Sequence, residues 1–109
     1  MNKRKNVKKY VIEVLQKEAE DIPVKNIKRL DWTAKSIPLN KIQVSKDITE
    51  KKHKERARFQ LQRIKRKEQI KPLIVMKCKF GDYWLVDGYA RYFALKKSGA
   101  KEVKVYYGH

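Results

Sequence analysis

The sequence has few of the residues that build a disulfide framework, a metal site or a membrane span. Cys78 is the single cysteine, so it has no partner for an internal disulfide, and the two histidines, His53 and His109, are far apart. We therefore expect neither a structural bridge nor a zinc site. No run approaches the roughly 18 apolar residues of a membrane-spanning helix, and no apolar leader with a cleavage site opens the chain. The expected location is the cytoplasm, without a membrane partner.

Acidic residues are also scarce. The 12 aspartates and glutamates face 29 lysines and arginines, which gives a formal net charge of +17 over 109 residues. This excess is larger than solubility requires and is typical of a protein that binds a polyanion, so nucleic acid, with DNA favoured, is the first expected partner. A basic adaptor that docks an acidic protein is the alternative. The length favours one small domain over a two-domain enzyme.

The first 35 residues are expected to form a basic helical extension before a domain at 36–109. Apolar residues recur at helical spacing over residues 3–20, at Val7, Tyr10, Val11, Val14 and Leu15. This helix is either a packing element or an arm that contacts DNA. Asp21 and Pro23 indicate a stop and a new start, which predicts a short helix to about Leu30.

Four later segments are predicted to be extended. Ser36–Leu39 is expected to be a strand or extended chain followed by a loop, and Trp32 before it is expected in the core. Leu73–Cys78 is a continuous apolar run, which is typical of a central strand covered on both faces. A turn at 80–82 predicts a hairpin to Tyr83–Val86. The last strand is Glu102–Tyr107, with Val103 and Val105 on one face.

Two further helices are expected around these strands. The first runs from Thr49 to Glu68, with Asp47 or Thr49 as its cap. Its buried stripe is expected to contain Ala57, Leu61 and Ile64. The second runs over 88–98 and is closed by Gly99. This order of elements predicts an α/β (α+β) fold.

The first of these helices lies in the densest basic block of the chain. Residues 51–71 contain ten lysines and arginines against Glu55 and Glu68. Such a run is either a solvated face or a nucleic-acid surface. The candidates for nucleic-acid binding are Lys51, Lys52, Lys54, Arg58, Lys65, Arg66 and Lys67.

An aromatic residue lies between two arginines on the same helix. Arg56, Phe59 and Arg63 are spaced i, i+3, i+7, so they share one stripe beside the apolar face. A ring flanked by guanidinium groups can hold a base or nucleotide by stacking and charge. In the alternative, Phe59 covers a core edge and the arginines point to water.

Asp87-Gly88 is predicted to form a tight corner between a strand and a helix. A glycine at such a corner lets the backbone approach a ligand, and the free N–H groups of the following first turn form an anion site. Arg91 lies in that first turn. Its guanidinium is suited to phosphate, so the corner is a candidate phosphate site.

Three pieces of sequence in a fixed order carry a family resemblance. They are Ile37-Pro38-Leu39, the helix that runs into Ile70-Lys71-Pro72-Leu73-Ile74-Val75, and Val86-Asp87-Gly88-Tyr89-Ala90-Arg91 followed by Ala94-Leu95 and Gly99. Together they resemble the ParB/sulfiredoxin superfamily, in particular the amino-terminal domain of ParB-type partition proteins. The resemblance covers about residues 36–107 and implies a small mixed sheet with packed helices.

The resemblance also implies a nucleotide-binding function. In that superfamily the corner binds nucleotide phosphates, and in its sulfiredoxin-like members the helix stripe faces the nucleotide. The residues implied for this role are Gly88, Tyr89, Ala90, Arg91, Arg56, Phe59, Arg63 and Lys71. The implied cofactor is ATP or CTP with Mg²⁺. The implied process is DNA partition, maintenance or regulation on a plasmid, phage or mobile element.

A nucleotide-dependent enzyme of the same fold, such as a phosphotransferase, nucleotidase or nuclease, is the alternative function. Sulfiredoxins place a reactive cysteine directly after the corner glycine, where this chain has Tyr89, so their chemistry is not expected. Tyr89 and Ala90 also replace a glutamate and an arginine of ParB-type proteins, which favours binding over hydrolysis. Asp82 and Asp87 alone do not make a nuclease metal site. We therefore expect no catalytic residue and no metal ligand.

Overall fold

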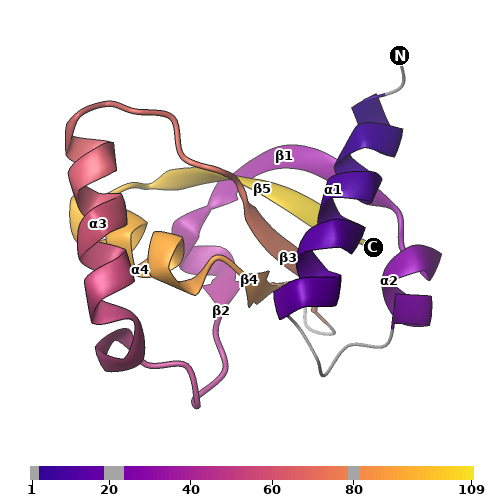
Figure 1. Ribbon diagram of the computed structural model, residues 1–109, viewed down its shortest axis with the longest axis horizontal. Coiled ribbons are helices and arrows are strands. Elements are labelled where there is room, and N and C mark those ends of the chain that lie inside the picture. The colour runs from indigo at the N-terminus through magenta and orange to yellow at the C-terminus, as the bar shows by residue number, and fades with distance from the viewer. Residues whose placement is uncertain (1–2, 19–23, 79–81) are drawn as a thin grey trace.

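The computed structural model describes residues 3–18, 24–78 and 82–109, and within these ranges the chain forms a mixed α/β fold (Figure 1). The helices are α1 (Lys3–Glu18), α2 (Val24–Arg29), α3 (Lys54–Lys65) and α4 (Tyr89–Ser98), with 3₁₀ turns η1 (Leu39–Lys41) and η2 (Glu50–His53). The strands are β1 (Trp32–Pro38), β2 (Ile42–Gln43), β3 (Leu73–Lys77), β4 (Tyr83–Asp87) and β5 (Glu102–Gly108). The predicted fold class is confirmed.

The five strands form one mixed sheet in the order β1-β5-β3-β4-β2. β1 is antiparallel to β5, β5 is parallel to β3, β3 is antiparallel to β4, and β4 is parallel to β2. The predicted central strand, β3, is therefore in the middle. Its Leu73 and Val75 side chains join one core and Ile74 joins the other, as expected for a strand covered on both faces.

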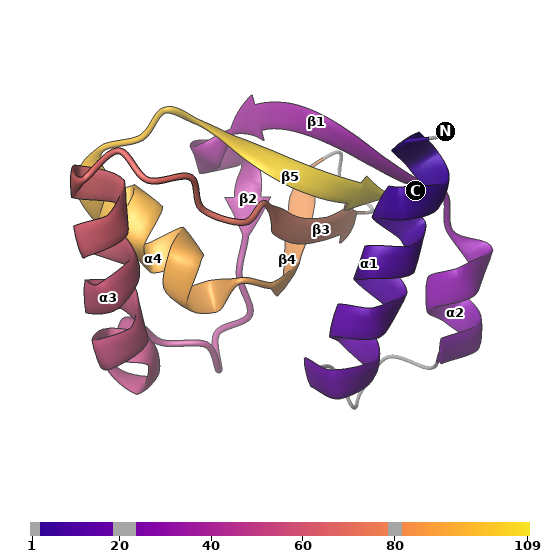
Figure 2. The ribbon, with the colours of Figure 1, turned by 45° about the horizontal axis from the view of Figure 1, so that its top comes forward.

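Helices cover the two faces of the sheet separately (Figures 1 and 2). On one face, Tyr89, Tyr92 and Leu95 of α4 pack on the core that contains Leu73 and Val75, and α3 packs on α4. On the other face, α1 and α2 bury a set that consists of Val11, Leu15 and Ile27 together with Trp32, Ile74 and Val86. The end of β4 and the start of α4 consequently lie between α3 on one side and α1 on the other.

Several element predictions are confirmed within the described residues. α1 and α2 form where helices were expected, although Asp21 and Pro23 lie outside the described residues. β3 and β4 pair antiparallel as a hairpin requires, while residues 80 and 81 of its turn also lie outside. Trp32 is buried, and its indole Nε1 donates a hydrogen bond to the Ile27 carbonyl at 3.0 Å.

Two strand predictions need correction. β1 begins at Trp32 rather than Ser36, because the chain pairs with β5 along seven residues, from Trp32 opposite Gly108 to Pro38 opposite Glu102. β2 lies where a loop was predicted. It has only two residues, too few to show a period, and it exists because Ile42 is buried beside β4.

The helix predicted over 49–68 is shorter and begins as a 3₁₀ turn. Thr49, one of the two predicted caps, occupies the N-cap position of η2 but makes no side-chain capping hydrogen bond, and the other candidate, Asp47, lies before that position. α3 ends at Lys65 because Lys67 adopts a left-handed φ of 60° and the Glu68 N–H donates to the Arg63 carbonyl at 3.0 Å. Ala57 is buried as predicted, whereas Leu61 and Ile64 are only half-buried.

The amino-terminal segment shares the core of the sheet. Val11 and Leu15 of α1 are fully buried against the sheet face, and the predicted boundary after residue 35 falls inside β1. The division into an extension at 1–35 and a domain at 36–109 stays a prediction. None of the described helices has the length and apolar character needed to cross a membrane.

Candidate functional site

The β4–α4 corner requires a glycine at position 88. Gly88 has φ 96° and ψ 32°, in the left-handed region that residues with a side chain rarely adopt. A Cβ atom on Gly88 would lie 2.8 Å from the Leu73 Cδ2 atom, which is closer than real Cβ contacts allow. Both the conformation and the space therefore require glycine. The helix then begins at once, since the Tyr92 N–H donates to the Gly88 carbonyl at 2.8 Å.

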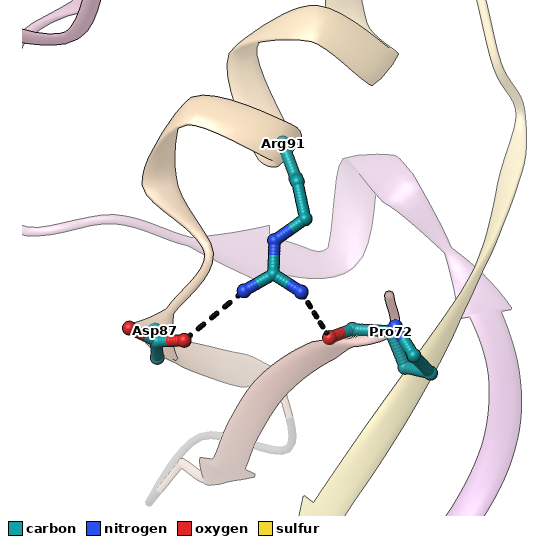
Figure 3. A network of polar contacts seen from close by, with 3 residues as sticks. All are labelled: Pro72, Asp87 and Arg91. Atoms are coloured by element: carbon teal, nitrogen blue, oxygen red, sulfur yellow. Dashed lines mark hydrogen bonds and ion pairs between the residues drawn. The ribbon is translucent and has the colours of Figure 1, made fainter. Parts of the chain in front are cut away.

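Arg91 holds this corner in place (Figure 3). Its Nη1 donates to the Pro72 carbonyl at 3.0 Å, and its Nη2 donates to Asp87 Oδ2 at 3.1 Å. The side chains of Arg91 and Asp87 are only 15% and 14% exposed. The guanidinium thus ties α4 to the end of β4 and to the residue before β3. Arg91 is a structural clamp here, whatever further N–H groups it offers to a ligand.

A cleft of about 590 Å³ opens at this corner, and residues of both α3 and α1 line it. Seven of the residues expected to bind nucleotide line it, namely Arg56, Phe59, Lys71, Gly88, Tyr89, Ala90 and Arg91. The structure therefore brings the predicted corner and most of the predicted helix stripe together. Their binding role stays a prediction.

Arg63 does not line the cleft. It lies near the end of α3, and its Nε donates to Glu68 Oε2 at 3.4 Å. Arg63, which was expected to bind nucleotide together with Arg56 and Arg91, therefore lies outside the cleft that those two residues line. The helix ends just after Arg63, and the chain turns so that Glu68 meets its side chain.

The cleft carries an excess of positive charge. Arg56 and Lys71 are exposed, and neither has an ion-pair or hydrogen-bond partner among the residues that the structure describes. Asp87 is the only acidic residue among the described residues that line the cleft, and it is paired with Arg91. The Ala90 and Arg91 N–H groups lie in the first turn of α4, where backbone donors have no acceptor within their own helix. Cations and backbone donors therefore converge where an anion can bind.

Phe59 is an exposed aromatic residue at this cleft. Phe59 is 64% exposed, so it does not cover a core edge, whereas Arg56 is exposed to water as the same alternative expected. A ring in water beside Arg56 is available for stacking.

Besides Asp87 of the predicted corner, five lining residues were not predicted from the sequence, namely Tyr10, Val14, His53, Gln60 and Val86. Tyr10 and Val14 belong to the expected apolar face of α1, and no local pattern indicates that part of this face borders a cleft. The His53 ring lies 5.5 Å from the Tyr89 ring and 6.3 Å from the Phe93 ring, so it packs η2 against the start of α4. The Gln60 Oε1 atom is buried and, among the described residues, has no hydrogen-bond partner.

The predicted nucleic-acid residues form an exposed basic surface. All of them are exposed on η2, on α3 and on the turn after it: Lys51, Lys52, Lys54, Arg58, Lys65, Arg66 and Lys67. Exposure is expected both of a solvated face and of a DNA surface, so it does not decide between them.

Cys78 is remote from the corner. The Cys78 N–H donates to the Asp82 carbonyl at 2.9 Å, so this residue lies beside the beginning of β4, whereas the corner follows the end of β4. The thiol therefore cannot act at the corner as a sulfiredoxin cysteine does. In the described ranges, no three His, Cys, Asp or Glu residues gather as metal ligands would.

Solved structures with the same fold include sulfiredoxins and ParB proteins. Sulfiredoxin from Arabidopsis thaliana matches with a TM-score of 0.59 and 21% identity, over 69% of this chain and 83% of that one. A Pnob8-like ParB-N domain matches with a TM-score of 0.57 and 29% identity, over 72% of this chain and 30% of that one.

The truncated chromosome-partitioning protein ParB from Caulobacter crescentus, complexed with CTP-γ-S, matches with a TM-score of 0.52 and 21% identity, over 69% of this chain and 43% of that one. The chain thus spans less than half of these two ParB chains. No match was found among curated protein sequences. The sequence pattern of the ParB N-terminal domain matches residues 16–107, so this chain belongs to the ParB N-terminal domain family.

Proposed function

We propose that the cleft binds the phosphates of a nucleoside triphosphate, CTP or ATP, in a protein that also binds DNA. The observation that carries this proposal is the convergence of the Gly88 corner with two cations, Arg56 and Lys71, that have no partner among the described residues. The volume of about 590 Å³ falls within the roughly 300–1,000 Å³ typical of small-molecule sites. The bound CTP analogue of the Caulobacter ParB supports the same class of ligand.

The phosphates would lie at the start of α4. The Ala90 and Arg91 N–H groups belong to the first turn, where the helix dipole favours negative charge. Arg56 and Lys71 would neutralise the phosphate oxygens from the side of α3 and of the segment before β3. Arg91 would act mainly by fixing the corner, because two of its bonds go to Pro72 and Asp87.

Mg²⁺ would accompany the nucleotide rather than occupy a protein site of its own. Asp87 is the single carboxylate among the described lining residues and is held by Arg91. Mg²⁺ commonly keeps several waters and binds through substrate phosphates with one or two carboxylates. The chain's residues fit that arrangement, with Asp87 as the candidate carboxylate.

DNA would bind through the exposed basic surface of η2 and α3. Its seven lysines and arginines and the net charge of +17 favour contacts to phosphates, which carry no sequence information. With six or more such contacts, affinity should fall by about 10³ or more between 50 and 200 mM salt. Membership of the ParB N-terminal domain family favours a role in DNA partition, maintenance or regulation, on a plasmid, phage or mobile element.

Calorimetric titration with CTP and ATP in the presence of Mg²⁺ tests the nucleotide site. We expect the double variant Arg56→Ala/Lys71→Ala to bind at least tenfold more weakly than wild type, because two charge-assisted contacts are lost. The control is Lys96→Ala/Lys101→Ala, which removes the same charge at exposed positions outside the cleft. Equal losses in both variants would reduce the effect to net charge and contradict the assigned site.

A further inference from the structure

The cleft has a wall that comes from α1, on the other side of the sheet from α3 and α4. Val11 and Leu15 anchor α1, since both are fully buried against the sheet. Tyr10 and Val14 each precede an anchor by one residue and line the cleft. Residues buried against the sheet and residues that line the cleft are therefore neighbours on the same helix. The packing of Val11 and Leu15 consequently also fixes the position of Tyr10 and Val14 at the cleft.

The Tyr10 ring is held in a defined orientation. It meets the Tyr106 ring of β5 edge to face, with ring centroids 5.4 Å apart and an interplanar angle of 72°. Such aromatic pairs add to the stability that area burial alone provides. The ring is only partly buried, so part of it stays open to the cleft. A pre-oriented aromatic side chain loses little freedom when a ligand contacts it.

This wall lies outside the segment that matches the family. The ParB N-terminal domain match begins at residue 16, after both Tyr10 and Val14. The cleft therefore combines a corner within the family segment with a wall from the residues before it.

The opposite wall is also apolar in part. Phe59 and Arg56 line the cleft from α3, and α3 and α1 lie on opposite sides of the β4–α4 corner in both views (Figures 1 and 2). Gln60 adds a buried acceptor atom, Oε1, with no hydrogen-bond partner among the described residues. A ligand that fits has a charged phosphate part for the corner and a flat apolar part with N–H donors for the walls. In a nucleotide, the base is such a flat part with N–H donors, and the phosphates are the charged part.

We propose that Tyr10 and Val14 of α1 hold the base of a nucleoside triphosphate whose phosphates lie at the start of α4. This inference rests on the proposed nucleotide function and extends it, because it assigns base recognition to two residues of α1 that precede the family segment. The corner binds the phosphates, whether or not a base is attached. The contact of α1 with the base makes a nucleotide bind more tightly than a bare phosphate chain.

Comparison of CTP and ATP with tripolyphosphate, each with Mg²⁺, tests the assignment by calorimetry. We expect wild type to bind a nucleotide more tightly than tripolyphosphate. Tyr10→Ala should weaken nucleotide binding by roughly fivefold to a hundredfold, the range produced by loss of one base–aromatic contact, and leave tripolyphosphate binding unchanged. Ile12→Ala is the control, since Ile12 packs on the same core from α1 without lining the cleft.

A second variant guards against loss of folding. Tyr10→Leu keeps an apolar side chain against Tyr106 and removes the aromatic ring, so it should also lose nucleotide affinity selectively. Equal affinity of wild type for nucleotide and tripolyphosphate, or equal losses in Tyr10→Ala and Ile12→Ala, would overturn the α1 assignment while the phosphate site stands. Absence of any binding of either ligand to wild type would overturn the nucleotide function itself.

Discussion

Replacement of Arg91 by alanine removes the clamp that joins α4 to β4 and to Pro72. Two hydrogen bonds from a charged group are lost, at 3.0 Å and 3.1 Å, and the side chain that makes them is only 15% exposed. Hydrogen bonds to charged groups contribute about 1.5–3 kcal/mol each. The two share one guanidinium and do not add fully, so we expect Arg91→Ala to lower the free energy of unfolding by roughly 2–4 kcal/mol.

Denaturant unfolding followed by circular dichroism measures this loss. Arg56→Ala is the matched control, because Arg56 lines the same cleft but is exposed and has no partner among the described residues. Its unfolding free energy should stay within about 0.5 kcal/mol of wild type. Arg91→Lys should fall between the two, since one ammonium cannot reproduce the planar fork that reaches both acceptors.

The two variants should also differ in how they affect binding. Arg56→Ala should weaken nucleotide binding in a fully folded protein, whereas Arg91→Ala should weaken it together with stability. If Arg91→Ala unfolds at the same denaturant concentration as wild type, the clamp described here contributes nothing measurable. The guanidinium would then be available to a phosphate, and the structural account of Arg91 would be refuted.

Two further changes test the corner and the basic surface. Gly88→Ala should lower the free energy of unfolding by roughly 2–4 kcal/mol, because the alanine is strained in the left-handed region and its Cβ crowds Leu73. Gly99 has a φ of 79° but open space around it, so Gly99→Ala should cost only about 1–2 kcal/mol. Equal losses in denaturant unfolding would refute the crowding argument. Replacement of Lys51, Lys52 and Lys54 by alanine should reduce the slope of log affinity for DNA against log salt by about 2 to 3, while Lys25, Lys28 and Lys104 serve as the control set. The slopes are measured by fluorescence anisotropy titrations with DNA. An unchanged slope in the variant of Lys51, Lys52 and Lys54 would show that these lysines do not contact DNA and form only a solvated face.

Local patterns predicted most of the elements and the chemistry of the corner. The apolar run from Leu73 indicated a central strand, and Asp87-Gly88 indicated a strand-to-helix corner, because both are encoded by neighbouring residues. The spacing of Arg56 and Phe59 indicated a shared stripe for the same reason. These features depend on the chain within one or two turns.

Features that depend on contacts between distant segments were not predicted. β2 has two residues and exists only beside β4. β1 begins as early as Trp32 because Gly108 opposite it leaves room for the Trp32 ring, whereas a Cβ atom at position 108 would lie 2.6 Å from that ring. The bond from Arg91 to Pro72 joins residues 19 apart, so the first turn of α4 suggested a phosphate ligand rather than a clamp. The wall formed by Tyr10 and Val14 likewise depends on how α1 packs on the sheet.

Titration of isotope-labelled protein with CTP or ATP in the presence of Mg²⁺, followed by amide NMR, shows whether a nucleotide binds at the β4–α4 corner. A phosphate at the corner would change the environment of the N–H groups that point at it. We expect saturable shifts of the Gly88, Ala90 and Arg91 amides, accompanied by shifts of the Tyr10 and Lys71 amides at the cleft walls. Corner amides that stay unmoved at millimolar nucleotide, or shifts confined to the basic surface of η2 and α3, would contradict a nucleotide site in this cleft.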